Sequence, residues 1–178
     1  MIRDALSRLV RAWLVTAIVD ALFSSALAVF AYRSTVTRLW QGVASILLGP
    51  AAFEGGARTT LVGLLLHCGV AFGWSAAFLA LYLSWPQLRR ALASFGGVIA
   101  VAALYGPAIW LVMSLVVIPL LSRRPPAFNF RWWVQLVGHI PFVAVPIVAV
   151  ISRPAGKPSR DGGTRAPASE HPVMLRGE

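Results

Sequence analysis

Residues 97–121, GVIAVAALYGPAIWLVMSLVVIPLL, decide the fold class, because this stretch contains no charged side chain. At 1.5 Å of rise per residue, a helix of that length is about 37 Å long, which exceeds the roughly 30 Å of a bilayer's hydrocarbon core. The stretch therefore predicts a transmembrane helix.

Three further apolar stretches have the length to cross a bilayer, at residues 10–32, 60–82 and 132–151. Hydrophobic residues make up 58% of the chain, well above the roughly 45–50% that is usual in soluble domains. The first stretch is longer than the apolar core of a signal peptide, so we expect it to be retained as a helix. The sequence predicts an all-α transmembrane bundle of four helices within residues 1–151.

Two segments lie outside these spans. Residues 39–53, LWQGVASILLGPAAF, are apolar but too short to cross, which indicates a short re-entrant or interfacial helix between the first and second spans. The pair Gly49 and Pro50 is expected to break it. Residues 152–178 are rich in Pro, Gly, Ser and charged side chains, and this composition predicts a disordered, basic cytoplasmic tail.

The basic residues indicate topology rather than nucleic-acid binding. The net charge is +10, yet the Lys and Arg residues lie at the ends of the spans, in the loops or in the tail, which leaves no basic soluble face for nucleic acid. The two termini and the second loop carry ten of the sixteen: Arg3, Arg8, Arg11, Arg89, Arg90, Arg153, Lys157, Arg160, Arg165 and Arg176. Because positive residues accumulate on the cytoplasmic side, we expect a multi-pass protein of a bacterial inner membrane with both termini in the cytoplasm.

Four polar residues inside the spans form a candidate intramembrane site. An ionised side chain at the bilayer centre costs ~2.5–3.5 kcal/mol on insertion scales, so Asp20 requires a partner or a role. His67 and His139 each follow the start of their span by about seven residues, on helices that run in the same direction, which puts them at one depth. Gln135 lies one turn before His139 on the same face. We therefore expect Asp20, His67, Gln135 and His139 to face the interior of the bundle.

Three interpretations of these residues stay open: hydrogen bonds that hold helices together, proton or ion handling, and a metal or haem site. Two histidines without a third ligand are weak evidence for a metal, so we predict no metal and no cofactor. The sequence also lacks the H-E-x-x-H, G-x-S-x-G, Walker and C-x-x-C patterns, so we do not expect an enzyme.

Small residues mark a second candidate feature, a stripe formed by Gly69, Gly73, Ala76 and Ala80 on the side of the second span opposite His67. Such stripes let helix backbones approach closely, so we expect a close helix contact there. The stripe also raises the hypothesis of an assembly subunit that pairs with a second copy or another membrane protein.

Most of the chain, from the first span to the fourth, resembles a family of uncharacterised bacterial integral membrane proteins, with the YagU-like inner-membrane proteins as its nearest named relatives. The matching residues are Gly55, Gly56, Gly63, Leu64, His67, Tyr105, Gly106, Met113, Pro119, Leu120 and His139. Ser114 stands where the family often has Asn, which weakens any role for an amide at that position. The resemblance implies the four-span architecture and the importance of these residues, and it implies no activity. The first functional hypothesis is therefore a small transporter-like or proton-responsive protein.

Overall fold

The computed structural model describes residues 2–153, which form helices joined by short connections. The helix α1 (Ile2–Ala26) continues into a π-helical turn, η1 (Leu27–Ala31), and α2 (Val36–Leu48) continues into a 3-10 turn, η2 (Gly49–Phe53). The long α3 (Gly56–Ser84) and the short α4 (Pro86–Ala91) follow. Next comes α5 (Phe95–Val112) with η3 (Met113–Val117) and α6 (Ile118–Ser122), and the last segment is α7 (Phe130–His139), η4 (Ile140–Ala144) and α8 (Val145–Ser152).

Four helical segments are long and apolar enough to cross a membrane: Ile2–Ala31, Gly56–Ser84, Phe95–Ser122 and Phe130–Ser152. They confirm the four predicted spans and the all-α fold class. The expected tail lies outside the described residues, except for Ser152, which ends α8, and Arg153.

The first span begins eight residues earlier than predicted, because its polar N-terminal turns remain helical. Nη2 of Arg8 lies 3.6 Å from Oδ2 of Asp4, and Asp4 is one turn earlier on α1. Its guanidinium also donates a 2.7 Å hydrogen bond to the carbonyl of Ile151, at the end of α8. This bond joins the first and last helices of the described chain and satisfies a carbonyl that a helix end leaves free.

The spans expose large apolar side chains on their outer faces, including Leu14, Ile18, Leu22, Leu65 and Leu104. In water such a surface would be unfavourable, whereas hydrocarbon is a good solvent for it. Together with the helix lengths, these exposed faces are those of a multi-pass membrane protein.

Side-chain caps set where three of the helices begin. Thr35, Ser94 and Asn129 precede α2, α5 and α7, and each side-chain oxygen accepts a hydrogen bond from a backbone N–H of the first turn. These bonds satisfy donors that have no partner within the helix. The end of α2 is set by Gly49, whose φ of +66° is in the left-handed region. The helix α2 confirms the predicted short helix between the first two spans.

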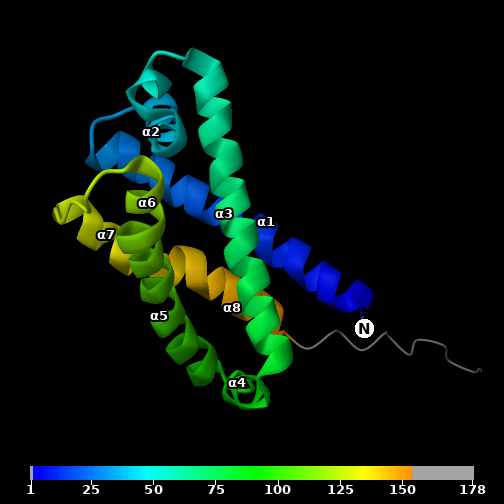
Figure 1. Ribbon diagram of the computed structural model, residues 1–178. Coiled ribbons are helices and arrows are strands. Elements are labelled where there is room, and N and C mark those ends of the chain that lie inside the picture. The colour runs from blue at the N-terminus through cyan, green and yellow to red at the C-terminus, as the bar shows by residue number, and fades with distance from the viewer. Residues whose placement is uncertain (1, 154–178) are drawn as a thin grey trace, which may run out of the picture.

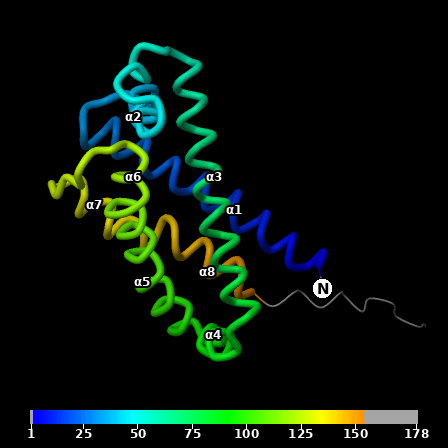
Figure 2. Tube along the Cα trace, viewed as in Figure 1, coloured from blue at the N-terminus to red at the C-terminus, as the bar shows by residue number. Residues whose placement is uncertain are grey.

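The bundle has two different ends. Figure 1 shows α2, α6 and α7 gathered at one end and α4 at the other, and the same division is visible along the trace in Figure 2. We call these the α2 end and the α4 end. The α1 helix packs against α8 and η4, and α2 packs against α3.

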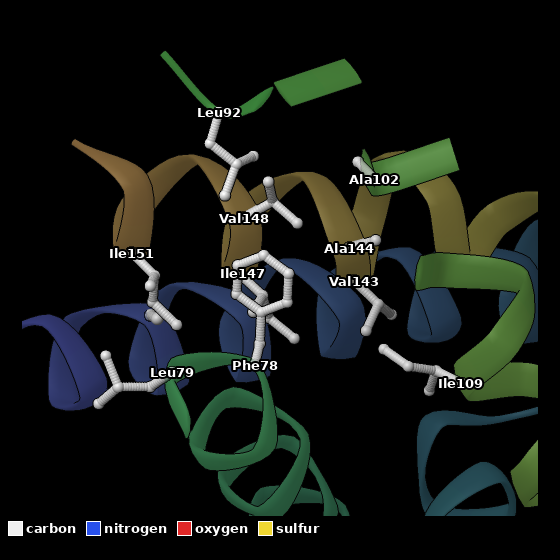
Figure 3. Close-up of a cluster of buried hydrophobic side chains, with 11 residues drawn as sticks. Phe78, Leu79, Leu92, Ala102, Ile109, Val143, Ala144, Ile147, Val148 and Ile151 are labelled. Atoms are coloured by element: carbon white, nitrogen blue, oxygen red, sulfur yellow. The ribbon is translucent and has the colours of Figure 1, made fainter. Parts of the chain in front are cut away.

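A solid apolar core fills the α4 end. Phe78 of α3 clusters with Ile147, Val148 and Ile151 of α8, and Leu92, from the turn after α4, lies beside Val148 (Figure 3). Phe78 and all three α8 side chains are almost completely buried. This packing leaves the polar residues of the spans to the other half of the bundle.

The expected close contact at the small-residue stripe is not made within the described residues. A methyl group added at Gly69 or Gly73 would meet open space, and Ala80 is exposed. The close approaches occur at other glycines instead. A methyl group at Gly63 would overlap the Trp40 carbonyl of α2, and one at Gly106 would come within 2.7 Å of the His139 carbonyl. The prediction was wrong inside this chain because the opposite face of α3, which carries Gly63 and His67, is the one that meets the other helices.

Candidate functional site

A cavity of about 650 Å³ occupies the α2 end of the bundle. It brings all four predicted polar residues into one lining: Asp20, His67, Gln135 and His139. These residues come from α1, α3 and α7, so the site forms only when three spans pack together. At the surface the lining includes Arg38 and Arg131, both exposed.

Asp20 and His67 form the closest pair of ionisable groups in the cavity. Oδ2 of Asp20 lies 3.7 Å from Nδ1 of His67, and both side chains are largely buried, with exposures of 16% and 13%. Asp20 lies on the face of α1 that also carries Thr16 and Ser24, one turn to each side, and all three line the cavity. The predicted inward polar stripe of α1 is therefore present.

The backbone of α1 decides which nitrogen of His67 carries the fixed proton. Nε2 lies 3.0 Å from the carbonyl oxygen of Ala17. A carbonyl oxygen only accepts hydrogen bonds, so Nε2 must donate. Nδ1 is then the nitrogen that gains or loses a proton, and it faces the carboxylate of Asp20.

In His139 the other ring nitrogen, Nδ1, is the one held by a backbone carbonyl. Its Nδ1 lies 2.7 Å from the backbone carbonyl of Gln135, one turn earlier on α7, so Nδ1 donates and Nε2 is left as the exchangeable nitrogen. Nε2 makes no hydrogen bond within residues 2–153. The ring lines the same cavity as His67 and Asp20. The two histidines thus present opposite nitrogens to one space.

The charge of the Asp20–His67 pair depends on how many protons it holds. With none, an anionic carboxylate would face a nitrogen lone pair, and with two the pair would carry a net positive charge away from bulk water. Both states are unfavourable in a medium of low dielectric constant. A single proton, on Nδ1 or on the carboxyl group, leaves the pair neutral overall.

Several polar atoms of the lining have no partner within the described residues. Oγ1 of Thr16, the hydroxyl of Tyr32 and Nε1 of Trp110 are buried without a hydrogen bond. Buried polar atoms in folded proteins are nearly always paired with protein groups or with water. These three atoms have almost no accessible surface, so they do not open onto the cavity.

Aromatic side chains border both histidines, and no sequence pattern singled them out. The Trp40 ring lies 5.1 Å from the His67 ring, and the Trp110 ring lies 4.9 Å from the His139 ring, centroid to centroid. At the surface, the guanidinium of Arg131 lies 4.3 Å above the Tyr32 ring. Trp110 belongs to a uniformly apolar span, so periodicity carried no signal for it.

Backbone irregularity occurs beside the site. The π-helical turn η4 starts directly after His139 and contains Pro141, which has no N–H to donate. Such turns are frequent near functional sites, because one extra residue re-aims the side chains around it. Here the turn separates the polar α7 from α8, which belongs to the apolar core.

A metal-binding interpretation gains little from this geometry. Within residues 2–153, no group of three or more His, Cys, Asp or Glu side chains is arranged to hold a metal ion. Metal sites in proteins commonly use at least three protein ligands.

Comparison of the chain with protein-family models, with curated proteins and with solved structures gives no match. The fold and the site define the class, a multi-pass membrane protein with a largely apolar cavity that a few ionisable side chains line. The resemblance to YagU-like proteins stays a prediction.

Proposed function

We propose that the chain is a small transporter-like or proton-responsive protein, rather than an enzyme. One observation carries the proposal: Asp20, His67 and His139, from three different spans, line a single cavity that reaches the surface at Arg38 and Arg131. Ionisable side chains inside a membrane are rare and are characteristic of ion and proton pathways.

Proton exchange in this site would use the two free imidazole nitrogens. Nδ1 of His67 exchanges a proton with Asp20, while Nε2 of His139 accepts or releases a proton in the same cavity. Because Asp20 is on α1 and the histidines are on α3 and α7, a change in protonation alters the attraction between helices.

We place the protein in a bacterial inner membrane with both termini in the cytoplasm, on the strength of the excess of Lys and Arg at the termini and the second loop. In this orientation the cavity faces away from the cytoplasm. The apolar core around Phe78 and Ile147 closes the cytoplasmic half. A cavity closed toward one side and open toward the other is the arrangement that one state of an alternating-access cycle would require.

Purified protein reconstituted into liposomes with an internal pH-sensitive dye tests the proposal. An imposed acid gradient should be discharged faster than in empty liposomes, and Asp20→Asn and His67→Gln should remove at least 90% of the added rate. The matched control is Asp4→Asn, because Asp4 is also an α1 carboxylate but lies outside the cavity and is half exposed.

A second measurement tests whether the protein responds to protons without transporting them. Trp40 and Trp110 adjoin the two histidine rings, so intrinsic fluorescence should follow pH between about 5 and 8 in a way that His67→Gln and His139→Gln each reduce. If the dye signal matches empty liposomes and the fluorescence titration is unchanged in both variants, the proposal is wrong.

Assembly with a second copy or another membrane protein is the alternative function. It is favoured by the open face of Gly69, Gly73 and Ala80, which no helix of the described residues covers. Substituting Gly69 and Gly73 together by Leu should then abolish co-purification of a differently tagged second copy, or of a second membrane protein. A strictly monomeric wild-type protein without a co-purifying chain contradicts this alternative.

A further inference from the structure

The main cavity, which Asp20, His67 and His139 line, is large and mostly apolar. Its volume of about 650 Å³ is within the roughly 300–1,000 Å³ that is usual for small-molecule sites in proteins. Apolar walls hold water poorly, and an inorganic ion would leave most of them without a partner. Aliphatic side chains of α2, α3, α5 and η3 contribute to these walls: Leu39, Val43, Ile46, Leu66, Ile109 and Val117. The ligand that fits this space therefore has an apolar body.

The ionisable groups in the cavity offer acceptor atoms to such a ligand. Nε2 of His67 and Nδ1 of His139 are held by backbone carbonyls. The nitrogens left to the cavity, Nδ1 of His67 and Nε2 of His139, carry lone pairs when the rings are neutral. The carboxylate of Asp20 only accepts, and none of these three side chains is completely buried. A ligand that pairs with them must therefore donate hydrogen bonds.

The charge of this group favours a cation as the donor. Among the described residues, Asp20 is the one acidic side chain that lines the cavity. A carboxylate in a medium of low dielectric constant is stabilised by a positive partner and is costly without one. An ammonium group beside ionised Asp20 leaves the site neutral while His67 is uncharged, as a single proton does. An organic ammonium can therefore take the place of that proton.

Three tryptophans in the walls suit both parts of such a ligand. Trp40, Trp74 and Trp110 all line the cavity, and the rings of Trp40 and Trp110 adjoin the two histidines. The face of an indole ring attracts cations, and the same ring packs well against apolar groups. The ammonium and the apolar body would thus both have partners.

The arginines at the mouth lie far from this group along the bundle. Arg38 is placed over the Phe53 ring and Arg131 over the Tyr32 ring, and both guanidinium groups belong to exposed residues. Tyr32 follows Asp20 by twelve residues on the same helical segment, which corresponds to about 18 Å. Water and salt screen exposed charges such as these. Asp20 therefore determines which charge is favoured deep in the cavity.

We infer that the main cavity binds hydrophobic organic amines in their protonated form. The ammonium pairs with Asp20 and donates to a free histidine nitrogen, while the apolar body packs against the tryptophans and the aliphatic wall. This inference rests on the proposed function, because it names the substrate class of the same cavity. It does not require the chain to move protons.

Equilibrium binding of (aminomethyl)anthracene to the detergent-solubilised full chain at neutral pH tests the inference. Energy transfer from tryptophan to anthracene reports binding, since three tryptophans line the cavity. We expect one amine per chain, bound at least about tenfold more tightly than anthracenemethanol or anthracenecarboxylic acid, which keep the ring and replace the ammonium. Equal binding of all three probes would mean that charge is not recognised, and tighter binding of the acid would mean that the arginines dominate. Either result overturns the inference.

A pair of variants identifies the carboxylate. Asp20→Asn should weaken binding of the amine at least about tenfold and leave binding of the alcohol unchanged. The matched control is Asp4→Asn, because Asp4 is also on α1 but does not line the cavity, and it should bind the amine as the wild type does. Equal loss in both variants would indicate attraction to negative charge in general and would overturn the inference. The comparison of the three probes uses the wild-type chain, so it decides the question even if Asp20→Asn folds poorly.

The outcome is independent of the liposome assay, because binding is measured without a pH gradient. A chain that prefers the amine but does not discharge the gradient contradicts proton transport alone. A chain that discharges the gradient but binds the three probes equally contradicts amine recognition alone.

Discussion

Nδ1 of His67 faces Oδ2 of Asp20 at 3.7 Å, and Nε2 of the same ring faces the Ala17 carbonyl at 3.0 Å, so both nitrogens of one α3 side chain contact α1. The carbonyl is a fixed acceptor, whereas the carboxylate can itself take a proton. Protonation at this contact therefore changes only the Nδ1 side, and the hydrogen bond to the backbone persists in both states. This asymmetry leads to the predictions that follow.

The two intramembrane histidines should have opposite neutral tautomers. We expect His67 to carry its proton on Nε2 and His139 to carry its proton on Nδ1, because each of these nitrogens is held by a backbone carbonyl. Solid-state ¹⁵N NMR of histidine-labelled protein in bilayers at pH 8 distinguishes the tautomers, with His67→Gln and His139→Gln assigning the signals. The same tautomer at both positions would contradict the geometry.

Asp20 and His67 should be energetically coupled. A double-mutant cycle of Asp20→Asn and His67→Gln, followed by unfolding of the detergent-solubilised protein, should give a coupling free energy of about 1–3 kcal/mol. The control cycle is Asp4→Asn with Arg8→Gln, a pair 3.6 Å apart at the bundle end with Asp4 half exposed, where we expect less than about 0.5 kcal/mol.

Two glycines of α3 should respond oppositely to the same change. Gly63→Ala puts a methyl group onto the Trp40 carbonyl and should destabilise the protein by about 1–3 kcal/mol through displacement of α2. Gly69→Ala meets open space, so it should be neutral or stabilising by up to about 1 kcal/mol, since alanine favours helix more than glycine. Thermal unfolding in detergent measures both, and similar effects of the two variants would argue against the close packing of α2 on α3.

Access to the cavity can be measured with small thiol reagents in a Cys68→Ala background. Thr16 and Ser75 are both small, polar and buried, with exposures of 1% and 0%, but only Thr16 lines the main cavity. Thr16→Cys should therefore react with a small water-soluble methanethiosulfonate at least about tenfold faster than Ser75→Cys. Equal protection of both cysteines would mean that water does not reach Thr16.

Much of the polar site was predictable, because charged and strongly polar residues are costly in hydrocarbon wherever they are exposed to lipid. Asp20, His67, Gln135 and His139 therefore had to face inward, and counting residues along the spans placed the two histidines at one depth. All four line one cavity. The same reasoning failed for Gly69 and Gly73, since a small-residue stripe indicates a face that allows close approach without specifying which helix approaches it.

Trp110 illustrates what the sequence leaves undetermined. It stands in a span where almost every residue is apolar, and hydrocarbon solvates the outside of such a helix as well as its neighbours do. Nothing in the pattern therefore separates a lipid-facing tryptophan from one that packs on His139. The sequence does not reveal the roles of Arg131 and Tyr32 either, because arginine and tyrosine are common at the membrane interface at the end of any span.

Hydrophobic length and the cost of intramembrane charge were enough to establish four spans, a short helix between the first two, and an inward polar set. Tertiary structure decided the rest: the Asp20–His67 contact, the cavity walls and the choice of Gly63 over Gly69 as the packing glycine. The physical reason is that the bilayer penalises exposed charge strongly and discriminates little among apolar faces. Which apolar face meets a neighbouring helix is decided by side-chain packing between helices, and this packing depends on residues distant in the chain.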